Sequence, residues 1–230
     1  METNKGLVVA FALDGEGKGV ELNWDQLIID KSKLDFLWVH LDYTHENARR
    51  WLIEESGVDE VIAEALLADD TRPRSSILKG GLLVMLRGVN TNPSETPEDM
   101  VSIRLWIEDG RVITTRKRQL LSISDIRESI EKNEGPETPG GLLVMLSDRL
   151  VARMATTIDD IDEEVDHLEN EVVGSENSHL RQRLAAVRMK VILIRRYLAP
   201  QREAMSRLHH DKVKWLSDGG WHYKSGSRFS

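Results

Sequence analysis

Three groups of residues carry side chains at spacings that suit a divalent cation. His167 and Glu171 lie four residues apart in an acidic helical segment, so they share one helix face, and imidazole with carboxylate suits zinc. His209-His210-Asp211, near the end of the last predicted helix, could likewise supply part of a zinc site, and adjacent carboxylates at Asp69-Asp70 suit a harder cation. Each group is incomplete and needs ligands from a facing helix or another subunit. The candidate metal ligands are Asp70, His167, Glu171, His209, His210 and Asp211.

A fourth group, His40-Leu-Asp-Tyr-Thr-His45, resembles the metal cluster of a hydrolase, because His40 and Asp42 fall on one face of a strand. The same residues also fit an ordinary strand-to-helix junction. In that interpretation Asp42 or Thr44 caps the following helix and His45 lies in its first turn. We favour the junction and keep the hydrolase site as an alternative.

Other kinds of chemistry find little support in the sequence. Gly15-Glu-Gly-Lys-Gly19 lacks the spacing of a phosphate-binding loop, and neither a nucleophile elbow nor a catalytic triad is visible. The 230 residues include no cysteine, so any metal must bind oxygen or imidazole. A formal net charge of −8 disfavours nucleic acid. We therefore predict no enzyme activity, no organic cofactor, no nucleic-acid partner and no small-molecule substrate besides metal ions.

The first part of the chain alternates between strand and helix patterns. Strands are predicted over 6–13 and 36–41, two short helices separated by Gly57 lie between 42 and 70, and antiparallel strands follow to residue 115. A helix is predicted over 121–132. The longest apolar run, Leu82 to Leu86, is far shorter than the roughly 20 residues of a membrane helix, so the chain as given is expected to be soluble.

The second part of the chain is helical. Thr138 and Pro139 are typical of a helix start, and Val173 to Asn177 separates that helix from the next, with Ser175 or Asn177 as its cap. Apolar residues recur at spacings of three and four in both helices, which predicts an antiparallel hairpin. Pro200 should distort the second helix near Ala199. The periodic residues are Leu143, Leu146, Leu150, Met154, Ile158, Ile161, Val165, Leu168 and Val172, then Leu180, Leu184, Val187, Val191, Ile194, Leu198, Met205 and Leu208.

Opposite charges favour the same pairing. Residues 159–171 carry eight acids, and residues 181–196 carry six bases and no acid. The two runs either neutralise each other across the hairpin or form two separate solvated faces. One further feature depends on context: Gly-Gly-Leu-Leu-Val-Met-Leu occurs at Gly80 and again at Gly140, and we expect the first copy to be a strand and the second a helix.

Several short motifs resemble one known family. Arg195-Arg-Tyr-Leu-Ala-Pro-Gln-Arg-Glu-Ala-Met205 is the most specific of them, and the resemblance spans residues 7–216. Together these motifs are similar to the ZntB-like, zinc-transporting branch of the CorA superfamily of metal-ion transporters. The other motifs are Trp38-Val-His-Leu-Asp42, Ala65-Leu-Leu67, Thr71-Arg-Pro-Arg74, Leu86-Arg-Gly-Val-Asn90 and Pro97-Glu-Asp-Met100.

The resemblance implies a fold of α+β or α/β class, with a mixed, largely antiparallel sheet flanked by helices, then a long antiparallel helical hairpin leading into a stalk helix. It implies a homopentamer in the bacterial inner membrane, with this domain in the cytoplasm, transporting zinc or magnesium. Family members add two membrane helices and a Gly-Met-Asn tripeptide, which this sequence lacks. We assign 1–135 to the α/β domain, 136–218 to the hairpin and start of the stalk, and 219–230 to a flexible tail.

Two alternatives stay open at this stage. One is the soluble metal-dependent hydrolase with His40, Asp42 and His45 in its site. The other is a coiled-coil adaptor, for which the apolar periodicity of the hairpin alone would suffice. The transporter domain is preferred because it alone accounts for motifs in both halves of the chain.

Overall fold

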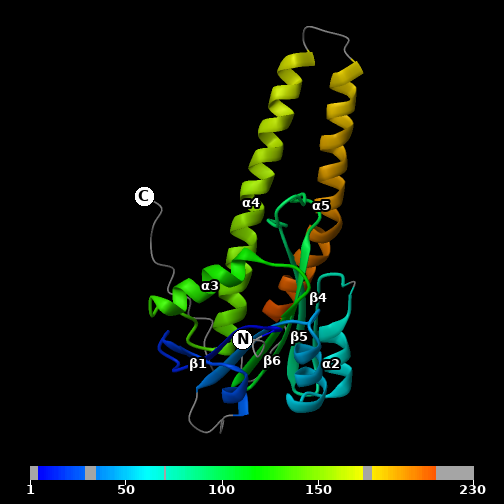
Figure 1. Cartoon of the computed structure of the whole chain (residues 1–230). Coiled ribbons are helices and arrows are strands. Elements are labelled where there is room, and N and C mark those ends of the chain that lie inside the picture. Colours follow the sequence, from blue (N-terminus) through cyan, green and yellow to red (C-terminus); the bar gives the residue numbers. More distant parts are fainter. Residues whose placement is uncertain (1–4, 29–34, 70, 173–177, 211–230) are drawn as a thin grey trace.

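A seven-stranded mixed sheet forms the base of the molecule (Figure 1). The computed structural model describes residues 5–28, 35–69, 71–172 and 178–210. Strand order is β2-β1-β3-β7-β6-β5-β4, and neighbours are antiparallel except for the parallel pair β3–β7. The strands are β1 (Leu7–Leu13), β2 (Gly19–Glu21), β3 (Phe36–Asp42), β4 (Arg74–Leu78), β5 (Gly81–Gly88), β6 (Val101–Glu108) and β7 (Arg111–Arg116).

Helices cover both faces of the sheet, which is why its central strands are apolar almost throughout. In β5, Leu82, Val84 and Leu86 point to one core, whereas Leu83 and Met85 point to the other. The first core lies under α3 (Leu121–Glu131) and the start of α4 (Pro139–Val172). The second lies under a 3-10 turn (Trp24–Ile28), α1 (Glu46–Arg50), a π-helical turn (Trp51–Glu55) and α2 (Glu60–Leu67).

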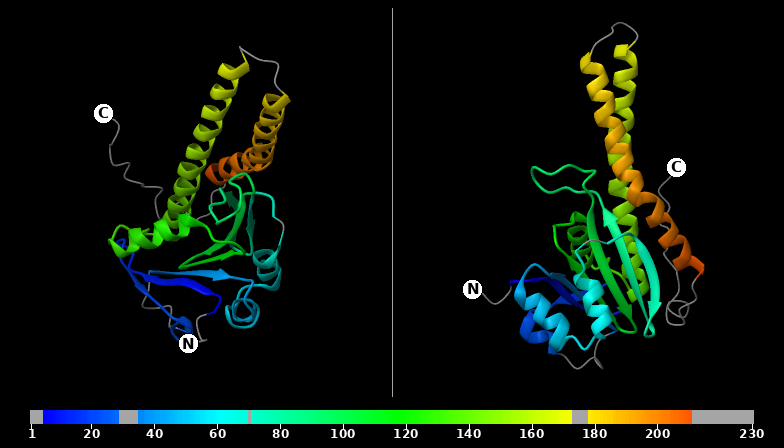
Figure 2. Two further views of the ribbon diagram at one scale, coloured as in Figure 1. Left: turned by 45° about the horizontal axis from the view of Figure 1, so that its top comes forward. Right: turned by 90° about the vertical axis from the view of Figure 1, so that its right-hand side faces the viewer.

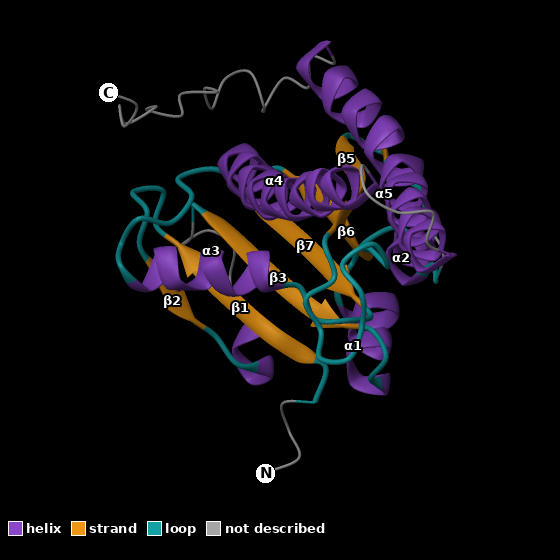
Figure 3. Ribbon diagram, turned by 90° about the horizontal axis from the view of Figure 1, so that it is seen from above, coloured by secondary structure: helices purple, strands orange, loops and turns teal. Residues whose placement is uncertain are grey.

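The hairpin of α4 and α5 (Ser178–His210) rises from the sheet (Figures 1 and 2). The lower part of α4 lies across the sheet, seen from above in Figure 3, and its upper part pairs with α5. Thr138 begins α4, since its Oγ1 accepts a hydrogen bond from the Gly141 N–H at 2.9 Å. The seam between the helices repeats every seven residues at Ile161 and Leu168, and at Leu180, Val187 and Ile194.

The predicted fold class is confirmed, with differences in detail. The first copy of the repeated apolar segment forms β5 and the second starts α4, as predicted. β2 was missed, because its three residues, two of them exposed, carry no apolar alternation. Residues 173–177, with the proposed caps Ser175 and Asn177, and the tail 219–230 lie outside the described residues.

Several of the periodic apolar residues of the hairpin are exposed. Ile158 is 38% exposed, Leu184 55% and Val191 44%. Two helices create only one seam, so apolar residues on the flanks of that seam have no third helix to cover them.

Pro200 lies inside α5, and the lower part of this helix turns away from the hairpin axis (Figure 2). The distortion predicted near Ala199 is therefore present, as expected for a residue that cannot donate the helical hydrogen bond. The bend brings the last turns of α5 alongside the edge strand β4, where Ser75 Oγ donates a hydrogen bond to the Ala204 carbonyl at 3.1 Å.

Candidate functional site

Arg87, near the end of β5, joins the sheet to α5. Its side chain is buried and donates hydrogen bonds to the Thr71 carbonyl, at 2.9 Å from Nη2, and to the Met100 carbonyl, at 2.8 Å from Nη1. The guanidinium carbon lies 4.1 Å from the centre of the Tyr197 ring on α5, a cation–π contact. One side chain thus connects the segment before β4, the start of β6 and α5.

The backbone of Arg87 is tied to the same helix. Its N–H donates to Oε1 of the buried Gln201 at 2.7 Å. We call Arg87, Tyr197 and Gln201 the α5 joint. A small apolar cluster beside it joins the residues next to β5 and β6 to both long helices: Val89, Met100 and Met154, with Tyr197 and Leu198 packed against them.

The upper hairpin carries the acidic run. Glu171 forms an ion pair with Arg183 at 2.8 Å, and Glu164 forms one with Lys190 at 2.8 Å. Charge pairing across the hairpin is therefore confirmed for these two pairs. Both pairs are partly exposed, where each is worth at most about 1 kcal/mol. The other acids of the run make no ion pair within the described part of the chain. They are Asp159, Asp160, Asp162, Glu163, Asp166 and Glu169, all exposed.

Of the six candidate metal ligands, the structure describes the side chains of two, His167 and Glu171. His167 is exposed on α4, and Glu171, one turn further on, is held by Arg183. Asp70 and Asp211 lie outside the described residues, and the side chains of His209 and His210, at the end of α5, are likewise not described. Over residues 5–28, 35–69, 71–172 and 178–210, no group of three or more potential ligands comes together. The metal ligands stay a prediction.

Asp69, beside Asp70, lies in a basic setting. Lys117 Nζ lies 2.8 Å from its Oδ1 and Tyr43 donates to the same oxygen at 3.2 Å, and both contacts keep the pKa of this carboxyl below its usual range. The fully buried Arg104 donates to the carbonyls of Ala68 and Asp69, which directly follow α2. These cations stabilise the end of α2 and compete with any metal for Asp69.

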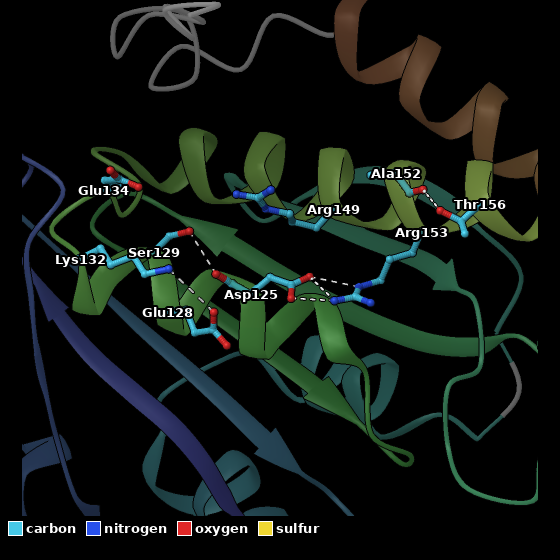
Figure 4. A pocket seen from close by; sticks show the side chains of 9 residues that line it. All are labelled: Asp125, Glu128, Ser129, Lys132, Glu134, Arg149, Ala152, Arg153 and Thr156. Atoms are coloured by element: carbon cyan, nitrogen blue, oxygen red, sulfur yellow. Dashed lines mark hydrogen bonds and ion pairs between the residues drawn. The ribbon is translucent and has the colours of Figure 1, made fainter. Parts of the chain in front are cut away.

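A groove of about 470 Å³ between α3 and α4 also brings charged groups together (Figure 4). Asp125 and Arg153 point toward each other across it, with oxygens and nitrogens 2.7–3.1 Å apart. The pair fastens α3 to α4. Because the Asp125 carboxylate is already bound by a guanidinium, the groove is a poor cation site.

The three residues of the hydrolase alternative do not form a common site. His40 is fully buried, with Nδ1 2.8 Å from Thr114 Oγ1, and burial lowers the pKa of its imidazole well below the usual value, with a smaller effect from Arg116. Asp42 Oδ1 accepts from the N–H and the hydroxyl of Thr44, at 3.1 and 2.6 Å, in a local turn. His45 is exposed.

The predicted helix cap at this junction needs correction. The N-cap of α1 is His45, one position later than Thr44, and its side chain makes no capping hydrogen bond. Asp42 accepts the N–H and the hydroxyl of Thr44, before the start of α1.

Comparison with known proteins decides between the alternatives. A family model described as "CorA-like Mg2+ transporter protein" matches residues 33–223, which is most of the chain. The chain belongs to the CorA-like family of metal-ion transporters. The resemblance seen in the sequence is confirmed, and the chain belongs to a transporter family rather than an enzyme family.

Curated relatives in this CorA-like family include two at similar identity. The zinc transport protein ZntB of Pectobacterium carotovorum is 33% identical over 215 residues, covering 94% of this chain and 64% of the relative. The divalent cation transporter CmaX of Pseudomonas aeruginosa is 36% identical over 215 residues, covering 92% and 65%. The chain thus spans about two thirds of the length of these relatives.

Solved structures of the family share the fold. Full-length CmaX superposes with a TM-score of 0.86 at 35% identity, covering 94% of this chain and 68% of that one. The cytoplasmic domain of ZntB from Vibrio parahaemolyticus gives 0.80 at 24% identity, covering 93% and 83%. Among the described helices, none combines the length and the apolar character needed to cross a bilayer.

The three joint residues fall within the motifs that resemble the family, but the sequence did not indicate that they contact one another. A usable signal existed: Arg87 interrupts the otherwise apolar run from Leu82 to Val89. A charge in a buried strand needs partners from other segments, and here these are Thr71, Met100 and Tyr197.

Replacing Gln201 with alanine should destabilise the fold, because the buried N–H of Arg87 loses its acceptor. We expect the free energy of unfolding to fall by about 1–3 kcal/mol, measured by urea denaturation. Arg195→Ala, at an exposed position of the same helix, is the matched control and should change it by less than about 0.5 kcal/mol. Equal effects of the two substitutions would contradict the role of the joint.

The lowered pKa of His40 predicts that the folded protein loses stability on acidification. The folded-state pKa of His40 is depressed, so below about pH 6.5 the unfolded chain takes up a proton that the folded chain does not. The free energy of unfolding should keep its full value above that pH and fall by up to about 1.4 kcal/mol per pH unit below it. Urea denaturation between pH 7 and pH 5 measures this slope. His40→Leu should flatten it, and an unchanged slope would show that His40 is not responsible.

Proposed function

We propose that this chain is the cytosolic domain of a CorA/ZntB-like divalent-cation transporter in the bacterial inner membrane. In this proposal it binds zinc or magnesium and couples cation binding to a membrane pore. Residues 1–135 form its α/β part and 136–218 its hairpin and the start of the stalk. The observation that carries the proposal is the match to full-length CmaX at 35% identity and a TM-score of 0.86.

The α5 joint supports the coupling part of the proposal. α5 is one continuous helix from the hairpin tip to residue 210, bent near Pro200, and the joint fixes it to the sheet just at the bend. A change in the upper hairpin that is transmitted along α5 must therefore move or strain these contacts. Buried contacts of this kind have few alternative arrangements, which suits a switch better than gradual bending.

Cation binding is supported by the charge of the upper hairpin. Within the described residues, six exposed acids near His167 on α4 have no basic partner, although the facing helix is basic. A divalent cation would relieve the repulsion among them. With no complete ligand set in the described part of one chain, a second subunit would supply the remaining ligands.

Self-association is supported by the apolar residues left uncovered on the hairpin. Leu184 and Val191 are seven residues apart on α5, so they lie on one helix face, and both are about half exposed. Such a stripe is typical of a surface covered by another helix. We propose that this other helix belongs to a neighbouring subunit of a homopentamer.

Light scattering coupled to size-exclusion chromatography tests the assembly. We expect concentration-dependent association up to a pentamer, weakened by Leu184→Glu because a carboxylate would have to be buried in the contact. Val20→Glu, at the 68% exposed position of β2, is the control and should leave assembly unchanged. A stable dimer that ignores zinc would instead favour a coiled-coil adaptor, and a monomer at every concentration would contradict self-association of this chain.

Zinc titration by isothermal calorimetry tests the metal ligands. His167→Ala should weaken zinc binding at least about tenfold, or about 1.4 kcal/mol, because it removes an imidazole ligand. His45→Ala removes an exposed histidine distant in sequence from the hairpin and should leave the affinity unchanged. Equal affinity in the parent chain and His167→Ala would exclude His167 and leave Asp70, Glu171, His209, His210 and Asp211 as the candidates.

A further inference from the structure

A cleft lined by arginines lies at the bend of α5, next to the joint. It encloses about 830 Å³. Arg72, from the segment before β4, lines it together with Arg196, Arg202 and Ser206 of α5. Pro200 and Glu203 complete its helical wall.

Positive charge dominates this cleft although the whole chain carries −8. Arg72, Arg196 and Arg202 are exposed, and none of the three makes an ion pair within residues 5–28, 35–69, 71–172 and 178–210. Glu203, the one acid of the lining, is held by Arg207 one turn further along α5. The charge available to a ligand in the cleft is therefore positive.

The position of these arginines differs from that of solvated bases along a helix. Arg196 lies beside the joint, with its guanidinium carbon 5.5 Å from the centre of the Tyr197 ring, and Arg202 directly follows Gln201. Arg72 adjoins Thr71, whose carbonyl accepts from Arg87. Guanidinium groups from two segments thus converge beside a fixed joint, with the Ser206 hydroxyl among them.

We infer that this cleft binds a phosphate-bearing anion. The planar guanidinium donates paired hydrogen bonds that match phosphate oxygens, and several of them together favour a group with more than one negative charge. The ligand would link the Arg72 segment to α5 and so strengthen the α5 joint from outside. This site is separate from the proposed cation site on the upper hairpin and does not depend on it.

Two sources share this chemistry, a soluble polyphosphate and the headgroup of an anionic lipid. Isothermal calorimetry with inorganic pyrophosphate and with ATP tests the first. Flotation with phosphatidylglycerol vesicles, compared with phosphatidylcholine vesicles, tests the second. We expect saturable binding to at least one probe, weakened about tenfold by Arg72→Ala and by Arg202→Ala, and weakened as salt rises.

The matched control is Arg181→Ala, which removes an exposed arginine near the tip end of α5. It should leave the affinity unchanged. All three variants alter exposed side chains, and their melting temperatures without ligand should match that of the parent chain. Absence of binding to every probe would overturn the inference. So would an equal loss of binding in Arg181→Ala, because that result would show attraction to positive charge in general.

Discussion

Burial of one guanidinium, that of Arg87, determines how the two halves of this molecule fit together. A buried cation is tolerated only when its donors find acceptors, and those of Arg87 find them in the carbonyls of Thr71 and Met100. The Tyr197 ring stacks on the same group, and Gln201 accepts the backbone N–H. Neither the sheet nor α5 alone can satisfy all of these groups. The position of α5 on the sheet is therefore specified by hydrogen bonds and a cation–π contact as well as by apolar packing.

Much of this architecture can be predicted from sequence because it depends on local patterns. Strand runs, the Thr138–Pro139 helix start and the periodicity of the hairpin all follow from short stretches of chain. The repeated Gly-Gly-Leu-Leu-Val-Met-Leu shows where local pattern is insufficient. At Gly80 the segment follows β4 and pairs with it as β5, whereas at Gly140 it follows a helix cap and becomes α4.

The remaining features could not be predicted because they depend on contacts between distant segments. Ile158, Leu184 and Val191 follow the same period as their buried neighbours, and only the geometry of a two-helix seam leaves them exposed. The cluster around Asp69 likewise joins residues from four separate places in the chain, among them Tyr43, Arg104 and Lys117. Sequence spacing identified Asp69-Asp70 as possible metal ligands but could not show that Lys117 binds Asp69.

The exposed acids and the contacts that anchor α5 to the sheet lie at opposite ends of the hairpin. This separation affects how the domain can respond to ions. Six acids that make no ion pair with any described residue lie on the upper part of α4, where exposed charges interact weakly and adjust at little cost. The contacts that hold α5 to the sheet lie at its lower part, where Gln201 and Ala204 meet Arg87 and Ser75. A cation bound among these acids would change the spacing of the two helices at small cost, and that change would reach the sheet through α4, which packs on it, and through the α5 joint.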